Sequence, residues 1–158
     1  MLKHTKGDLL ALAEQGNFDI VVQGCNCFCT MGSGIARQIR EQYPQAYEAD
    51  LETEQGDILK LGNFTSCLAG SVNEFIIVNA YTQFGFNRAG ESNDVFEYAS
   101  FELILQKLAH VYGDRNFGFP YIGMGLAGGD KQRIVGLLEW FTDLVGKQGG
   151  TVTLVEFG

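Results

Sequence analysis

The 158-residue sequence predicts a single α/β domain, a three-layer α/β/α sandwich around a largely parallel central sheet. Short apolar or β-branched runs alternate with helical patterns along the whole chain, without a repeat, linker or low-complexity tract. Two glycine-rich turns each stand between a strand run and a helical pattern. A chain of this length can bury roughly 70% of its unfolded surface around one core.

The N-terminal part of the chain predicts a strand, a helix and a second strand. Residues 2–5 form a short strand candidate, and Gly7-Asp8 supplies a turn and an N-cap for a helix over 9–14. The β-branched run Ile20-Val21-Val22 is typical of a buried strand, which we expect over 19–23.

The first glycine-rich turn follows that strand and precedes two helices. Ile35, Ile39 and Tyr43 recur at four-residue steps, which predicts a helix over 34–42. Pro44 ends this helix and can begin the next one. The turn is therefore expected at a helix N-terminus.

Two strands and a long helix are expected in the middle of the chain. The strand candidates over 63–69 and 75–80 are separated by turn residues, so they form a hairpin or neighbouring strands. After a polar loop, apolar residues at helical spacing predict a helix that starts at Val95 and ends near Gly113.

The C-terminal part again has the order strand, glycine-rich turn, helix and strand. A short apolar strand over 117–121 leads into the second turn. Asp130 begins the clearest amphipathic pattern of the chain, which ends at Gly146, and 151–157 is a β-branched strand. Ligands in such sheets bind beyond the carboxyl ends of the strands, where both turns fall.

The charge of the chain limits the ligands to be expected. The net charge is −8 and no lysine or arginine cluster is present, so bulk binding of DNA or RNA is not expected. A bound phosphate would be neutralised by helix dipoles and backbone amides, which favours a small ligand. The start of the sequence lacks a signal-peptide core, and no apolar run approaches a membrane span, so we expect a cytoplasmic protein without membrane contact.

Three cysteines alternate directly before the first turn. The spacing of Cys25, Cys27 and Cys29 is not a zinc pattern, so no metal site and no cofactor are expected. In an extended segment their side chains share one face, as small buried residues, or one of them serves as a nucleophilic thiol.

The two glycine-rich turns are residues 31–36 (MGSGIA) and 122–129 (IGMGLAGG). The first is neither a P-loop, because no Gly-Lys-Ser/Thr follows, nor a dinucleotide-binding fingerprint, because the third glycine is missing. Each turn alone can be a simple chain reversal. As a pair before two helices they predict a ligand whose diphosphate is held from both sides.

The motifs around these turns resemble the macro domain family. The resemblance is carried by KGDLL at the start, by VQGCNC at 22–27, by both glycine turns and by the closing strand, and so spans nearly the full chain. Within the family, the chain looks like the branch that contains ADP-ribose-1''-phosphate phosphatases and glycohydrolases acting on terminal ADP-ribose. The resemblance implies one domain over 1–158, with a mixed, largely parallel six-stranded sheet and ADP-ribose in a cleft across its crest.

The resemblance also implies the contacts of ADP-ribose. Asp8 would accept the adenine amino group, with the backbone of Leu9 at the ring and Phe157 beside it; Asp8 is alternatively a plain N-cap. The diphosphate would lie between two sets of loop residues: Met31, Gly32, Ser33, Gly34, Ile35 and Ala36 on one side, and Gly123, Met124, Gly125, Leu126 and Ala127 on the other.

The catalytic residues of the branch are only partly matched. Its glycohydrolases have a lysine after the middle strand and an aspartate directly after the Gly-x-Gly-Leu of the second loop. This chain has no lysine between Lys60 and Lys107, and Ala127 stands at the aspartate position. A lysine-dependent covalent mechanism is therefore disfavoured.

The remaining polar residues near the loops are few. Asp130 is the candidate acid or base at the terminal ribose, and it is also an ideal N-cap for the helix that follows. Asn26 falls where the family places an asparagine near that ribose, or is only a turn residue. Gln23, Ser33 and Tyr81 are candidate polar positioners of the ligand.

Three functions remain open from the sequence. The first is hydrolysis of ADP-ribose derivatives, above all removal of the 1''-phosphate from ADP-ribose-1''-phosphate. The second is recognition of ADP-ribose, free or attached to a macromolecule, without chemistry. The third is removal of ADP-ribose from an ADP-ribosylated macromolecule by a route that uses no lysine.

Overall fold

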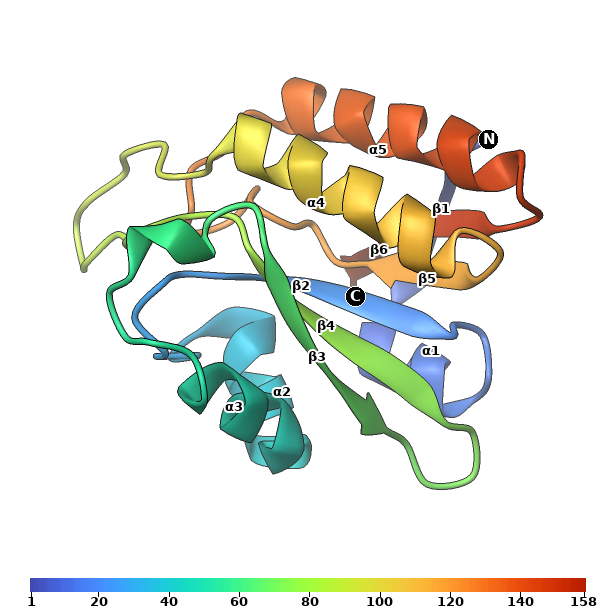
Figure 1. Ribbon diagram of the computed structural model, residues 1–158, viewed down its shortest axis with the longest axis horizontal. Helices are drawn as coiled ribbons and strands as arrows, with labels where there is room; N and C mark the ends of the chain where they lie inside the picture. The colour runs from blue at the N-terminus through green and yellow to red at the C-terminus, as the bar shows by residue number, and fades with distance from the viewer.

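A central sheet separates two helical layers (Figure 1). The computed structural model describes residues 1–158. The strands are β1 (Lys3–Gly7), β2 (Ile20–Cys25), β3 (Phe64–Ala69), β4 (Phe75–Tyr81), β5 (Asn116–Phe119) and β6 (Thr151–Phe157). The helices are α1 (Leu9–Glu14), α2 (Gly34–Gln42), α3 (Pro44–Leu51), α4 (Tyr98–Tyr112) and α5 (Lys131–Gly146), with the short 3-10 helix η1 (Ile58–Lys60).

The sheet has six strands in the order β1-β6-β5-β2-β4-β3. All neighbours are parallel except β3 and β4, which form an antiparallel pair. The expected mixed, largely parallel six-stranded sheet is confirmed, and so is the expectation that the strands over 63–69 and 75–80 are neighbours. Helices α4 and α5 cover one face, and α1, α2 and α3 cover the other (Figure 1).

The core lies on both faces of the sheet. Under α4 and α5, four phenylalanines pack edge to face or stacked with ring centroids 5.0–6.4 Å apart: Phe101, Phe117, Phe119 and Phe141. Under α1 to α3, a second cluster joins Leu9 and Ile39 to Ile77 of β4. Strands β2 and β5 lie inside the sheet and are buried on both faces over most of their length, and each carries a run of apolar residues, at 20–22 and at 117–119.

Four predicted boundaries differ from the structure by two or three residues: β1 ends at Gly7 rather than at residue 5, β2 ends at Cys25 rather than at residue 23, and two more differ next to the second glycine turn. Helix α4 begins at Tyr98 rather than at Val95, because Val95 donates its N–H to the carbonyl of Ala127 (2.9 Å) and thereby joins the loops. Strand β5 ends at Phe119 rather than at 121, since Pro120 has no N–H to donate and its carbonyl accepts from Ile122 in a tight turn (2.6 Å).

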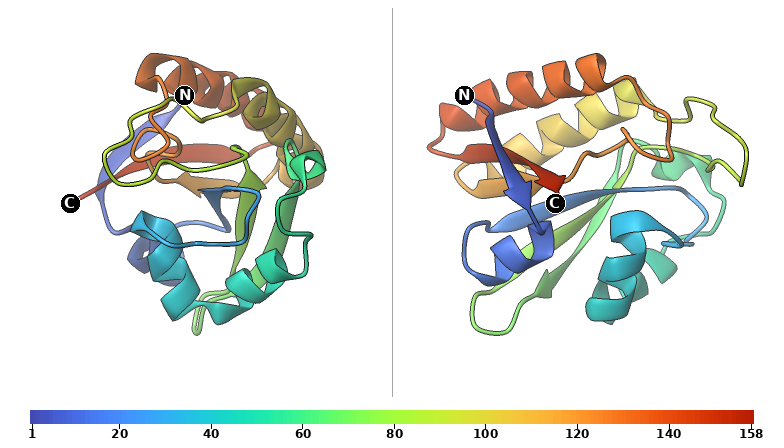
Figure 2. Two further views of the ribbon diagram at one scale, coloured as in Figure 1. Left: turned by 90° about the vertical axis from the view of Figure 1, so that its left-hand side faces the viewer. Right: turned by 180° about the vertical axis from the view of Figure 1, so that it is seen from behind.

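Three loops gather at the carboxyl ends of the central strands: 26–33 after β2, 82–97 after β4 and 120–130 after β5. Figure 2, left panel, shows this end of the molecule facing the viewer. None of the helices combines the length and the apolar character that a bilayer-crossing segment needs.

Candidate functional site

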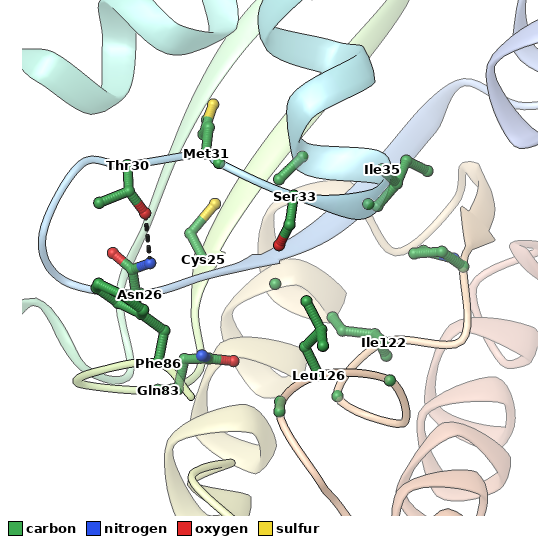
Figure 3. Close-up of a pocket in the computed structure, with 18 of the residues that line it drawn as sticks. Cys25, Asn26, Thr30, Met31, Ser33, Ile35, Gln83, Phe86, Ile122 and Leu126 are labelled. Atoms are coloured by element: carbon green, nitrogen blue, oxygen red, sulfur yellow. Dashed lines mark hydrogen bonds between the residues drawn. The ribbon is translucent and has the colours of Figure 1, made fainter. Parts of the chain in front are cut away.

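A cavity of about 520 Å³ opens between these three loops. Its walls are shown in Figure 3, where the segment with Cys25, Met31 and Ser33 faces the turn with Ile122 and Leu126. The lining residues are Gly24, Cys25, Asn26, Thr30, Met31, Gly32, Ser33, Gly34, Ile35, Ala36, Asp50, Gln83, Phe86, Asn87, Pro120, Tyr121, Ile122, Gly123, Gly125, Leu126 and Ala127. The two glycine turns that the sequence singled out therefore form opposite walls of one cavity.

The first glycine turn leaves the start of helix α2 open. Ser33 is the N-cap, but its side chain makes no capping hydrogen bond. The N–H groups of residues 34–36 find no acceptor in the protein. By contrast, aspartates cap α1 and α5. A helix N-terminus with free N–H groups carries a partial positive charge, which here borders the cavity.

The second glycine turn also has free N–H groups, at residues 123, 125, 126 and 127. Its carbonyls are held by the neighbouring loop: Asn87 Nδ2 donates to Leu126 O (2.7 Å), and Val95 N–H donates to Ala127 O (2.9 Å). Since N–H and C=O point in opposite directions in a planar trans peptide, fixing Leu126 O directs the N–H of Ala127 away from Asn87. The loop over 82–97 thus holds the second turn in shape.

Glycine is needed for different reasons along these turns. Gly123 has a positive φ of 73°, and a Cβ there would collide with the ring of Phe96. At Gly32 and Gly125 a Cβ would meet nothing within 4 Å. Packing within the protein therefore explains Gly123 but leaves Gly32 and Gly125 unexplained, as expected where a ligand approaches the backbone closely.

Asn26 lines the cavity and is also a turn residue. Its Oδ1 accepts from the N–H of Phe28 (2.8 Å), and its Nδ2 donates to Thr30 Oγ1 (2.7 Å; Figure 3). The turn alternative is therefore present, and it places Asn26 in the cavity wall. Its rim neighbour Phe86 belongs to an aromatic cluster at the cavity mouth, 6.5 Å from Phe28 between ring centroids.

The residues expected at adenine lie beside the cavity rather than in its wall. Asp8 is exposed and caps α1, accepting from Leu10 N (3.0 Å) and Ala11 N (3.2 Å). Leu9 is buried in the core. The exposed Phe157 is one register position from Asp8, because Gly7 pairs with Phe157 between β1 and β6. Asp8 and Phe157 therefore share one end of the sheet.

Three other expected contact residues do not line the cavity. Gln23 is fully buried and donates to Asn79 Oδ1 (2.8 Å), and Tyr81 is buried with its hydroxyl 2.8 Å from Asp50 Oδ1. Met124 is half-buried and packs against the core under α4 and α5. In strands, residues 23 and 81 point to the α1–α3 face, whereas the cavity lies beyond the strand ends.

Asp130 is the N-cap of α5 and does not line the cavity. Its Oδ1 accepts from Gln132 N (2.9 Å) and Arg133 N (3.4 Å). Its own N–H is accepted by the hydroxyl of Tyr98 (2.8 Å). These hydrogen bonds are those of the helix N-cap, the structural role that the sequence also predicted for Asp130.

Asp50 is a cavity residue that the sequence reasoning missed. It lies near the end of α3, is 1% exposed and lines the cavity wall. Burial raises the pKa of Asp50, against the opposing effects of the Tyr81 hydroxyl and the Lys60 charge. The available signal was its spacing of four from the buried Ala46, which turns a carboxylate to the inner side of a helix.

The three alternating cysteines are all buried, but not along one extended segment. The strand ends at Cys25, and Cys29 has a positive φ of 58°. Burial raises the pKa of the Cys25 and Cys27 thiols, which favours the unreactive thiol form over the thiolate. These two side chains therefore behave as small buried residues rather than as nucleophiles.

Comparisons with known proteins agree with this geometry, although no family model matches the chain. The chain is 33% identical over 149 residues, 90% of either protein, to an uncharacterized 17.5 kDa protein of Enterobacteria phage T4, encoded in the tk-vs intergenic region. The macrodomain of Mycobacterium tuberculosis DarG superimposes with a TM-score of 0.72 at 19% identity, over 99% of this chain and 97% of that one.

A macrodomain of Trypanosoma brucei, solved in complex with ADP-ribose, has a TM-score of 0.68 at 16% identity, over 99% of this chain and 63% of that one. The resemblance noted from the sequence is thereby confirmed at the level of the fold. This chain has the macrodomain fold and belongs to one family with the 17.5 kDa protein of phage T4.

Proposed function

We propose that this macrodomain binds ADP-ribose, with the diphosphate between the two glycine turns. The observation that carries the proposal is the pair of facing turns whose N–H groups at 34–36 and at 123 and 125–127 have no acceptor in the protein. The first N–H groups of a helix have no intrahelical acceptor, and together with the helix dipole they form a ready site for anions. The ADP-ribose complex of the Trypanosoma macrodomain supports the same ligand.

The size and charge of the site fit this ligand. A cavity of about 520 Å³ suits the diphosphate and one ribose, within the range of small-molecule sites. No lysine or arginine lines it, so backbone amides would balance the two phosphate charges. Asp8 and Phe157, side by side at the ends of β1 and β6, are the proposed adenine contacts.

The finer proposal is hydrolysis of ADP-ribose derivatives, with ADP-ribose-1''-phosphate as the substrate. The free N–H groups that hold a diphosphate can also stabilise charge on a phosphoryl group in transfer. Asn26 is the proposed positioning residue at the terminal ribose, and Asp130 is the acid or base proposed from the sequence. Asp130 caps α5 through Oδ1 and does not line the cavity, which favours binding without chemistry as the second candidate function.

Thermal unfolding with ligand tests the binding proposal. ADP-ribose at a hundredfold excess over Kd stabilises a protein by about 2.7 kcal/mol, which raises Tm by roughly 5–10 °C at this size. The shift is expected to persist in Asp130→Ala, because the affinity comes from the loops. An unchanged Tm with saturating ADP-ribose contradicts the proposal.

Two activity assays separate the candidate functions. Phosphate release from ADP-ribose-1''-phosphate above a protein-free blank supports the phosphatase function. If no phosphate is released but ADP-ribose still raises Tm, the result supports a protein that binds ADP-ribose without chemistry. Loss of label from an ADP-ribosylated protein or nucleic acid, without phosphate release, identifies removal of ADP-ribose from macromolecules.

A further inference from the structure

The cavity wall contains one buried carboxyl group, that of Asp50. It lies under the segment over 25–31: Cys29 Sγ is 3.2 Å from Asp50 O, and Asp50 lines the cavity together with Cys25 and Asn26. Tyr81 donates its hydroxyl to Asp50 Oδ1 at 2.8 Å. The Cys29 thiol is the other side-chain group that stabilises the ionised carboxyl. Since the Tyr81 hydroxyl occupies Oδ1, Oδ2 is the oxygen left for a ligand in the cavity that Asp50 lines.

The charges around Asp50 do not include an ion pair. The two ion pairs of the structure, Arg37–Glu41 and Arg115–Asp114, are on the surface. The groups that face Asp50 are Tyr81 from β4, Cys25 from β2, Cys29 from the following loop and Lys60 from η1. Lys60 Nζ donates to Cys27 O (3.0 Å) and lies over the Tyr81 ring, 4.8 Å from its centroid.

This environment suits a proton-exchanging group. Burial raises the pKa of Asp50, while the Tyr81 hydroxyl and the Lys60 charge favour its ionised form. Burial thus brings the pKa of this carboxyl above its ordinary value, in the direction that a general acid or base requires. Asp130, by contrast, is exposed and occupied as a helix cap.

We propose that Asp50 is the acid–base residue of the cavity and that its Oδ2 contacts the ligand at the terminal ribose. The inference rests on the proposed ADP-ribose function, because the ribose end is assigned through Asn26. Cys25, Asn26, Thr30 and Met31 share one wall in Figure 3, and Asp50 lines the same cavity beneath that segment.

The corresponding step in phosphate removal is balanced with water alone. Ionised Asp50 takes a proton from the attacking water while the water oxygen bonds to phosphorus and the bond between phosphorus and the 1''-oxygen breaks. The leaving 1''-oxygen, on the opposite side of phosphorus, takes a proton from a second water, and the protonated carboxyl returns its proton to the hydroxide so formed. The products are ADP-ribose and inorganic phosphate, and Asp50 returns to its ionised form.

Proton exchange on binding tests the contact without relying on activity. Calorimetry in buffers of different ionisation enthalpy is carried out with ADP-ribose and with ADP, which lacks the terminal ribose. The wild type is expected to exchange a proton with ADP-ribose and none with ADP. Asp50→Asn is expected to lose that exchange, to bind ADP-ribose about tenfold or more weakly, and to bind ADP as the wild type does.

Tyr81→Phe provides a second variant, should Asp50→Asn fold poorly. The lost hydroxyl favours the ionised form in the wild type, so its removal moves the pH midpoint of the proton exchange upward. Asp143→Asn, which removes an exposed charge from α5 in the opposite layer, is the matched control and leaves the exchange unchanged.

The outcomes separate the two proposals. A wild type that does not bind ADP-ribose refutes the proposed function itself. Three results overturn the role of Asp50. The first is that Asp50→Asn binds ADP-ribose with the same proton exchange as the wild type, and the second is that it binds ADP and ADP-ribose equally more weakly. The third is that the pH midpoint of the proton exchange does not move in Tyr81→Phe. If the wild type releases phosphate and Asp50→Asn releases it at the same rate, this result also overturns the role of Asp50.

Discussion

Alanine at Gly125 is expected to block the ligand while leaving the fold intact. Gly125 lines the cavity, its φ is not in the left-handed region, and a Cβ built there meets nothing within 4 Å. The substitution therefore adds one methyl group to open space between the turns. Gly32 on the opposite wall has the same properties, so Gly32→Ala is a second, independent variant for the same test.

The magnitude follows from two separate effects. In the free protein, alanine reduces the entropy of the unfolded chain, which stabilises the fold by about 0.4–1 kcal/mol and raises Tm by roughly 1–4 °C. In the complex, the methyl group occupies space that the phosphates need. Overpacking of this kind costs about 1–3 kcal/mol, which corresponds to a roughly 5- to 150-fold rise in Kd.

Titration calorimetry with ADP-ribose measures the effect, with Gly136→Ala as the control. Gly136 is exposed in the middle of α5, has open space at its Cβ and does not line the cavity. Its alanine variant is expected to gain about 0.8–1 kcal/mol of stability from helix propensity, with an unchanged Kd. If Gly125→Ala and Gly32→Ala both bind as tightly as Gly136→Ala, the two turns do not hold the diphosphate.

Three further substitutions test the supporting structure. Asp130→Ala removes the α5 cap, so urea denaturation should show a loss of about 0.5–2 kcal/mol, and an unchanged stability contradicts the capping role. For Asp50→Asn, the quantity to follow is the difference in unfolding free energy between variant and wild type at each pH. This difference should shift in favour of the variant as pH rises from about 4. The raised pKa means that the folded wild type holds the proton to higher pH than the unfolded chain, so ionisation costs stability; a constant difference across pH refutes this. Asn87→Ala removes the hydrogen bonds to Leu126 O and Asn93 O (2.7 Å each) and should weaken ADP-ribose binding in calorimetry, whereas an equal Kd shows that the second turn keeps its shape alone.

The fold could be predicted from the sequence because its signals are local. A strand such as Ile20–Cys25 is marked by its own β-branched residues, and α5 is marked by its own spacing and by the aspartate that caps it. The glycine turns were found for the same reason, since each follows its strand directly. The wrong start of α4 at Val95 arises where two loops bond to each other, which no local pattern records, whereas the end of β5 is marked locally by Pro120.

The cavity residues were predicted less well, because membership depends on contacts between distant segments. Gln23 is polar and close to the first turn in sequence, but it points to the α1–α3 face and bonds Asn79. Asp50 and Asn87 were missed, since each reaches the cavity from an element whose position is set by tertiary packing. The sequence thus identified the backbone part of the site and missed its buried acid.

The positions of the lysines strengthen the case against lysine chemistry. The sequence shows only that none occurs between Lys60 and Lys107. In the structure Lys60 is 8% exposed and bound to Cys27 O, and Lys107 donates to Gly62 O (2.9 Å) and Asn63 Oδ1 (2.6 Å). Neither lysine lines the cavity, so no amine is available to attack the sugar. Water is then the nucleophile of the hydrolysis proposed for this cavity, and a proton acceptor at the wall would assist its attack. Among the lining side chains, the carboxyl group is found only at Asp50.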